Sequence, residues 1–152
     1  MITEALNPIY EYIDSKSVMV LSTAGATYAT RATPVFFSRQ GNKFYFISVS
    51  KTIHAQNISI NHKIAAAITK NYKNYCEIKG VQLFGECFEL EGIKPLALAA
   101  MSYFSKFSDL KSFMNMELIK SAVDINWYEL NAQKIIYTDN TIRFGYKAEF
   151  DL

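Results

Sequence analysis

The stretch Ser48-Val49-Ser50-Lys51-Thr52-Ile53-His54-Ala55-Gln56-Asn57-Ile58-Ser59-Ile60-Asn61 changes along its length from a strand pattern to a helix pattern. Hydroxyl and basic side chains gather at the junction, from Ser50 to His54. The start of a helix leaves several backbone N–H groups without intrahelical partners, and its dipole favours negative charge there. The junction therefore has the features of an anion site. A plain N-cap at Ser50 and a solvated Lys51 would explain the same residues without a ligand.

Length and composition indicate a single domain over residues 1–152, because half of the 152 residues are hydrophobic and can form one core. The net charge of +2 comes from scattered Lys and Arg, so we expect no nucleic-acid partner and no anionic membrane. No apolar run reaches the roughly 20 residues that span a bilayer. Together with the absence of a secretion signal, this predicts a soluble cytoplasmic protein.

Cysteine and aromatic content give two further indications. Cys76 and Cys87 are the only cysteines and do not form a C-x-x-C pair, which favours a reducing compartment and two buried, inert thiols. The chain has 10 Tyr and 11 Phe, a high aromatic content for its size. This surplus of flat apolar surface suits a twin subunit or a planar ligand.

Hydrophobic spacing predicts a mainly β protein with flanking helices. Helical periodicity marks the first fifteen residues, the segment from about Ser50 to Asn61, the segment after Gly92 and a short piece around 116–123. Strand patterns cover residues 18–23, 27–37, 43–49, 63–69, 75–90, 124–130, 134–138 and 142–150. Pro34 must lie at a sheet edge or a bulge. Gly80 and Gly85 predict bulges or bends of the kind that close a small barrel.

Several chemistries lack the residues that they need. His54 and His62 are the only histidines, and no His/Cys cluster or acidic loop accompanies them, so we expect no metal site. There is no G-x-S-x-G elbow and no Gly-rich phosphate loop. The basic and aromatic run from Thr69 to Tyr75 is interpreted as a hairpin tip, because the glutamates of the next strand would repel a nucleic acid.

Four segments carry a resemblance to a known superfamily. They are Ala29-Thr30-Arg31-Ala32-Thr33-Pro34-Val35-Phe36-Phe37, Phe44-Tyr45-Phe46-Ile47-Ser48, Lys51-Thr52-Ile53-His54-Ala55-Gln56-Asn57-Ile58 and Gly80-Val81-Gln82-Leu83-Phe84-Gly85-Glu86. The combination resembles the FMN-binding split-barrel superfamily related to pyridoxamine-phosphate oxidase. The T-D-N…F-G-x-K ending, from Thr138 to Lys147, resembles a small, functionally uncharacterised bacterial branch of it.

The resemblance implies a six-stranded antiparallel split β-barrel that forms a homodimer with two FMN molecules at the subunit interface. In that arrangement the flavin ring lies along the backbone of Thr33, Pro34 and Val35. The ribityl phosphate is reached by Ser48, Lys51, Thr52 and His54. Weaker candidates for polar groups from the second subunit are Lys79, Gln82 and Lys147.

Two departures from the superfamily pattern limit the expected function. His54 stands where many relatives have Lys or Arg, so we expect FMN affinity to be modest or pH-dependent. The C-terminal Trp and Arg-x-His grouping that grips pyridoxamine phosphate is absent from Tyr137 to Phe144, so we do not expect pyridoxamine-phosphate oxidation.

The leading hypothesis is an FMN-dependent oxidoreductase acting on an unidentified small planar substrate in the dimer cleft, with the chemistry carried by the flavin. No general acid or base can be assigned. Two alternatives stay open. One is a flavin-binding or flavin-sensing module without catalysis, and the other is a haem-binding or haem-degrading split barrel, in which His54 and His62 are the only histidines available as axial ligands.

Overall fold

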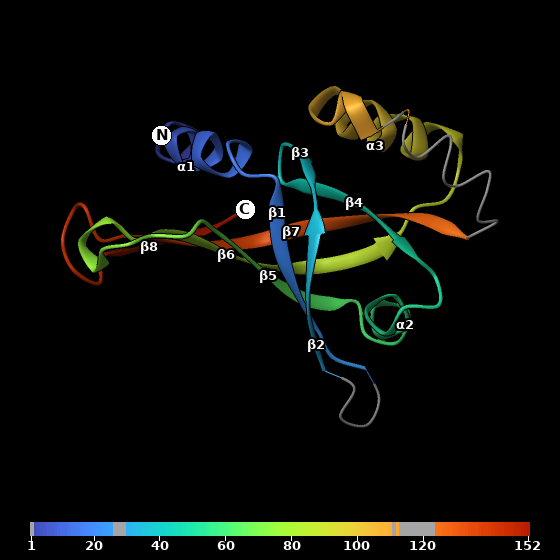
Figure 1. The fold of residues 1–152 in the computed structure, drawn as a ribbon, viewed down its shortest axis with the longest axis horizontal. Helices are drawn as coiled ribbons and strands as arrows, with labels where there is room; N and C mark the ends of the chain where they lie inside the picture. The colour runs from blue at the N-terminus through green and yellow to red at the C-terminus, as the bar shows by residue number, and fades with distance from the viewer. Residues whose placement is uncertain (1, 26–29, 111, 113–123) are drawn as a thin grey trace.

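The computed structural model describes residues 2–25, 30–110, 112 and 124–152 (Figure 1). Its elements in chain order are α1 (Ile2–Asp14), β1 (Val18–Thr23), β2 (Arg31–Phe36), β3 (Ser38–Gln40), β4 (Lys43–Val49), α2 (Ile53–Ile60), β5 (Lys63–Thr69), the 3-10 turn η1 (Tyr75–Glu77), β6 (Lys79–Glu89), α3 (Ile93–Lys106), β7 (Ile125–Asp139) and β8 (Lys147–Asp151). Among the described residues, no helix has both the length and the apolar character needed to cross a membrane.

The strands form one antiparallel sheet in the order β2-β1-β5-β6-β7-β4-β3, with β8 paired to β7. β7 is 15 residues long and pairs with β6, β4 and β8 along its length. β2 and β4 contact one another although four strands separate them in this order, so the sheet curls into an open barrel (Figure 1). The predicted split β-barrel with flanking helices is confirmed.

The sheet contains eight strands rather than the six that the resemblance implied. Its two shortest strands are β3, with three residues, and β8, with five. The two strands predicted over 124–130 and 134–138 are a single strand, β7. Asn131 pairs with β4 and β6, and Ala132 pairs with β6, so the ladder continues through the predicted gap to the register shift. The short helical piece expected around 116–123 lies outside the described residues.

The core lies inside the curled sheet and is closed by helices. Leu6, Ile9 and Ile13 of α1 are buried, which confirms the helical spacing of the first fifteen residues. In β4 both Phe44 and Tyr45 are buried although they alternate between faces, so both faces of this strand are covered, as predicted. In Figure 1, α1 and α3 lie above the sheet and α2 lies below it.

One proline and two glycines in the strands were expected to mark edges, bulges or bends. Pro34 lies on β2, which is at the end of the strand order and pairs with β1, so the predicted edge position is confirmed. Gly85 lies at a register shift between β6 and β7, where an added Cβ would overlap the carbonyl of Asn131. Of the bulge or bend predicted at Gly80, the bulge is wrong, because Gly80 pairs in regular register with Thr138.

Three element boundaries and one burial prediction also change. β2 begins at Arg31, and residues 27–29 of the longer predicted strand lie outside the described part of the chain. β8 begins at Lys147 rather than at residue 142, because the Asn140 side chain accepts from the Gly145 N–H at 3.0 Å and holds a turn there. The predicted strand over 75–90 starts with the 3-10 turn η1, which leaves Cys76 exposed, whereas Cys87 is buried as expected.

Candidate functional site

Three side chains converge where β4 leads into α2, and we call them the hydroxyl–imidazole cluster: Ser48, Thr52 and His54. The Ser48 Oγ lies 2.6 Å from His54 Nε2 and 3.2 Å from Thr52 Oγ1. The Thr52 Oγ1 lies 3.3 Å from the same imidazole nitrogen. All three side chains are partly buried. The structure therefore brings together three of the residues that the sequence assigned to the phosphate.

Thr52 organises the start of α2. Its Oγ1 donates to the Val49 carbonyl at 2.8 Å and accepts from the Ala55 N–H at 3.3 Å, so the N-cap is Thr52 and not Ser50. Among the described residues, the N–H groups of Ile53 and His54 have no hydrogen-bond partner. Two free backbone donors therefore lie beside the hydroxyl–imidazole cluster.

The helix is fixed against the barrel by its inner face. Ala55 and Ile58 are buried in the core, and the buried Asn57 donates from Nδ2 to Thr23 Oγ1 at 3.2 Å. An added Cβ at Gly25 would overlap the Asn57 amide oxygen, so the chain after β1 passes close to the helix. The position of α2 against the barrel therefore depends on Gly25 and on the buried Asn57 amide. Because α2 carries His54, these contacts also fix the position of the hydroxyl–imidazole cluster.

Burial and charge differ between the two basic residues of the site. Burial lowers the pKa of His54 below its ordinary value of 6.5, so its imidazole is mostly neutral at pH 7 in the free protein. Lys51 is exposed and carries a full positive charge beside the helix start. The permanent positive charge for an anion would therefore come from Lys51 and the helix start, and His54 would serve as a hydrogen-bonding group whose charge depends on pH.

The remaining predicted residues lie elsewhere in the barrel. Thr33, Pro34 and Val35 are in the edge strand β2, which contacts α2. Gln82 is exposed on β6, and Lys147 is exposed at the start of β8. These last two are not part of the hydroxyl–imidazole cluster within this chain.

The geometry of β7 separates Lys147 from the cluster. Ser48 pairs with Asn126 near one end of this strand, and Lys147 pairs with Thr138 near the other. At about 3.3 Å per residue, the twelve intervening steps correspond to roughly 40 Å of strand. Lys147 therefore lies far from the cluster within this chain.

Arg31 is a candidate that the sequence analysis quoted within a motif but did not assign to the site. It pairs with Thr23, the residue that holds Asn57 of α2, so Arg31 lies at the end of β2 nearest the helix. Its side chain is exposed and its guanidinium donates to the Thr30 carbonyl at 2.8 Å. The basic residue two positions before Thr33 in the Thr30-Arg31-Ala32-Thr33 segment was the available signal.

His62 occupies a different environment from His54. Its Nδ1 lies 3.2 Å from the Cys87 carbonyl oxygen, and its ring centroid lies 4.3 Å from that of Phe88. Together with Ile58 and Tyr128, these two rings line a cavity of about 220 Å³. Within the described part of the chain, no group of three or more His, Cys, Asp or Glu side chains is placed to hold a metal ion.

The curled antiparallel sheet, with a capped helix directly after β4, is an open split-barrel fold that several solved structures share. A protein of the pyridoxinephosphate oxidase family from Clostridium acetobutylicum, related to general stress protein 26, superposes with a TM-score of 0.72 at 14% identity and covers 98% of this chain and 95% of that one. HutZ from Vibrio cholerae, described as a haem storage protein, gives 0.69 at 14% identity over 84% of this chain and 89% of that one.

A haem-binding protein from Mycobacterium smegmatis gives a TM-score of 0.74 at 17% identity. The match covers 92% of this chain and 55% of that longer chain, so this chain spans little more than half of it. These likenesses establish the fold.

Curated relatives define the family within this class. A UPF0306 protein from Photorhabdus laumondii is 29% identical over 146 residues, which cover 95% of this chain and 94% of the relative. A UPF0306 protein from an Enterobacter species is 32% identical over 107 residues, covering 70% of this chain and 68% of the relative. The chain belongs to the UPF0306 family, in agreement with the resemblance to an uncharacterised bacterial branch. No family model matches it.

Proposed function

We propose that this chain binds FMN, with the flavin phosphate held at the start of α2, and acts as an FMN-dependent oxidoreductase on a small planar substrate. The observation that carries the proposal is the convergence of Ser48, Thr52 and His54 within 2.6–3.3 Å of one another. These groups lie beside unpaired backbone N–H groups, and such a set of donors is suited to a phosphate. The fold shared with a member of the pyridoxinephosphate oxidase family supports a flavin nucleotide as its source.

The residues present fit the phosphate end of FMN. Lys51 supplies the permanent charge, and the hydroxyl–imidazole cluster supplies directed hydrogen bonds. Thr33, Pro34 and Val35 lie on the edge strand β2, which contacts α2, and their backbone would run beside the flat flavin ring. Bound flavin would supply hydride or single-electron transfer, and the chain's own residues would position it and exclude water.

A homodimer is part of the proposal. Lys147 pairs with Thr138 and Gln82 pairs with Ile136, both near the end of β7 away from the Ser48–Asn126 pair, so their predicted role requires a second copy. In that arrangement one subunit provides the phosphate site at α2, and the other provides polar groups from β6 and β8. A small planar substrate would stack on the flavin ring in the cleft between them.

The phosphate assignment is tested by removing its two basic side chains together. We expect Lys51→Ala with His54→Ala to weaken FMN binding at least ~10-fold, because each loses a contact to a charged group. Quenching of flavin fluorescence during titration measures the dissociation constant. Lys94→Ala, an exposed lysine on α3, is the matched control and should leave the constant unchanged. An unchanged constant in the double variant would refute the assignment.

The reactivity of the bound flavin distinguishes an oxidoreductase from a non-catalytic flavin-binding module. An oxidoreductase should show reduction of the bound flavin by NADH or NADPH and its reoxidation by a small acceptor, each faster than for free FMN. A flavin that stays oxidised under both donors would favour the non-catalytic flavin-binding module.

Haem binding is the second candidate function, and the geometry of His62 favours it. A histidine that donates Nδ1–H to a carbonyl presents a neutral Nε2 to a metal. The His62 Nδ1 has such a carbonyl at 3.2 Å, and its Nε2 has no partner among the described residues. The His54 Nε2 is instead occupied by Ser48. The haem names of the Mycobacterium smegmatis and Vibrio cholerae neighbours agree with this candidate.

The haem candidate makes a prediction that differs between the two histidines. If haem binds through His62, addition of haemin to the wild type gives a sharpened, shifted Soret band, and His62→Ala abolishes this change. His54→Ala is the matched control and retains it. A Soret change that is the same in wild type and His62→Ala would remove His62 as the iron ligand.

A further inference from the structure

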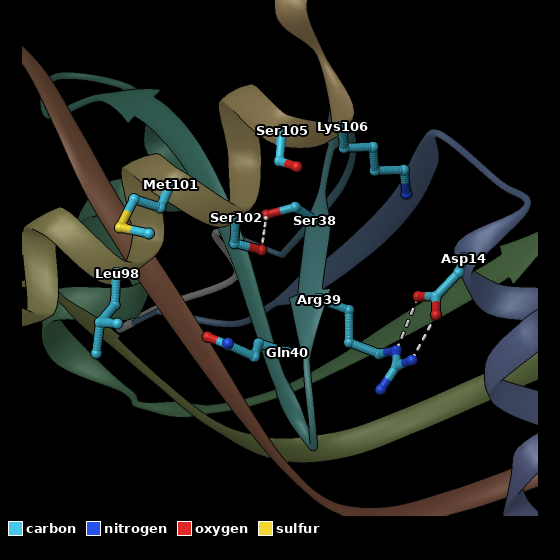
Figure 2. A pocket seen from close by; sticks show the side chains of 9 residues that line it. All are labelled: Asp14, Ser38, Arg39, Gln40, Leu98, Met101, Ser102, Ser105 and Lys106. Carbon is cyan, nitrogen blue, oxygen red and sulfur yellow. Dashed lines mark hydrogen bonds and ion pairs between the residues drawn. The ribbon is translucent and has the colours of Figure 1, made fainter.

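A second pocket, separate from the site at α2, lies between the end of α1, strand β3 and helix α3 (Figure 2). Its volume is about 440 Å³, within the usual range for small-molecule sites. Its lining residues are Asp14, Ser38, Arg39, Gln40, Leu98, Met101, Ser102, Ser105 and Lys106. None of them belongs to β4, α2 or β2, so the pocket is independent of the proposed flavin site.

The lining changes from apolar to charged across the pocket. Figure 2 shows Leu98 and Met101 on one side, Arg39, Asp14 and Lys106 on the other, and serine hydroxyls between them. Leu98 is 42% exposed and Met101 is 70% exposed, so both present apolar surface to the opening. A ligand that matches this order has one apolar end and one anionic end.

The two cations of the pocket differ in their free donors. Arg39 donates Nε to Asp14 Oδ1 at 2.9 Å and Nη1 to the Gly41 carbonyl at 2.6 Å, and its guanidinium also forms an ion pair with Asp14 Oδ2. Its charge is therefore already neutralised by a carboxylate. Among the described pocket residues, Lys106 is the cation without a carboxylate within ion-pair distance.

Among the described residues, Lys106 is held in place by a carbonyl and an aromatic ring rather than by a carboxylate. Its Nζ donates to the Lys16 carbonyl at 2.5 Å and lies 4.0 Å from the centroid of the Phe37 ring. Two of its three ammonium donors remain for a ligand. A partly buried ammonium without a counter-ion is unfavourable, and an anion in the pocket would remove this cost.

Serines supply further donors next to Lys106. The Ser102 Oγ is 3.0 Å from the buried Ser38 Oγ, and Ser105 is exposed one turn further along α3. We propose that this pocket binds a short aliphatic carboxylate, with the carboxylate on Lys106 and the serine hydroxyls and the hydrocarbon chain along Leu98 and Met101.

The pKa of Lys106 is consistent with a carboxylate binding at its amine. Burial lowers the pKa of Lys106 to about 8, while Asp14 from α1 opposes the shift and Arg39 from β3 adds to it. Lys16 faces the amine through its backbone carbonyl. A bound carboxylate favours the ammonium form, so binding raises this pKa and is accompanied by proton uptake near pH 8.

The test is a titration of the full chain with hexanoate, acetate and inorganic phosphate, followed by amide chemical shifts. We expect saturable hexanoate binding that is ~10-fold or more tighter than acetate binding, because the longer chain buries additional CH₂ groups. Lys106→Met keeps an unbranched apolar stem and removes the charge, and should weaken hexanoate at least ~10-fold. Met101→Ser should weaken hexanoate and leave acetate unchanged, whereas Ile93→Ser, on the exposed start of α3, should change neither.

Three outcomes at the amides of the pocket residues would overturn the proposal: no saturable shift with hexanoate, equal affinity for hexanoate and acetate, or phosphate binding there as tight as hexanoate binding. Shifts at the start of α2 report the proposed flavin site and are analysed separately. A direct titration of the Lys106 amine in the wild type gives an answer even if Lys106→Met fails to fold. Saturating hexanoate should raise its pKa, and an unchanged value would contradict carboxylate binding at Lys106. Because these readouts do not involve flavin or haem, their failure leaves the proposed function untouched.

Discussion

At the scale of single residues, His54 determines how the proposed phosphate site responds to pH. The imidazole is partly buried and bonded to the Ser48 hydroxyl, and its lowered pKa keeps it neutral in the free protein at pH 7. A relative with Lys or Arg at this position would present a permanent charge. Because its pKa is lowered on folding, the folded state favours neutral His54. Its contribution to stability is present above pH 6.5 and is lost as the pH falls through the lowered pKa.

We expect FMN affinity to rise as the pH is lowered from 8 to 6.5. A bound phosphate favours protonated His54 and raises its pKa, so the complex takes up a proton over this interval. Below about pH 6 the phosphate itself becomes protonated and the gain diminishes. The dissociation constant measured at several pH values should show this slope in the wild type and lose it in His54→Gln. A slope that persists in His54→Gln would assign the dependence to another group.

At the scale of elements, the helix of the first fifteen residues and most strands could be predicted, but the start of the helix after β4, the short strand β3 and the continuity of β7 could not. Local sequence pattern is enough to place Leu6, Ile9 and Ile13 on one helix face and to mark both faces of β4 as apolar. Burial in the core then follows from their hydrophobicity. The position of Thr52 as the cap depends on hydrogen bonds to Val49 and Ala55, and Ser50 has the same cap propensity. The continuity of β7 depends on three partner strands, which no local pattern reveals.

The two glycines of β6 look alike in the sequence but differ in their packing, and this difference gives a stability prediction. An added Cβ at Gly85 would overlap the Asn131 carbonyl, whereas one at Gly80 would have no heavy atom nearer than 3.7 Å. We expect Gly85→Ala to lower the free energy of unfolding by about 1–3 kcal/mol or more, because the paired strand must shift. Gly80→Ala, the control, should change it by less than about 1 kcal/mol. Urea unfolding measures both, and equal losses would contradict the packing at the bulge.

The candidate site was predictable in part, for a physical reason. Ser48, Thr52 and His54 are close in sequence, so a strand followed by a helix brings them together whatever the rest of the chain does. Lys147 is far from them in sequence, and its position depends on the path of β7 and on any second subunit. Arg31 was not assigned, because its nearness to α2 arises from the pairing of β2 with β1 and from the Asn57–Thr23 contact.

At the scale of the whole molecule, the curled sheet separates two sets of polar groups. The hydroxyl–imidazole cluster lies near one end of β7, and Lys147 lies near the other. A monomer therefore offers the proposed phosphate site without the polar groups that the superfamily resemblance places around the flavin. Two chains in a symmetric dimer would provide two such sites, each composed of both subunits. The proposed cofactor and the proposed homodimer therefore depend on one another.

The most direct test of the central claim is a titration of the wild-type protein with FMN and, in parallel, with riboflavin at pH 7. If the start of α2 holds the flavin phosphate, FMN binds saturably at one molecule per chain, and riboflavin, which lacks the phosphate, binds at least ~10-fold more weakly. Equal affinity for the two flavins, or no saturable binding of FMN, would contradict the account.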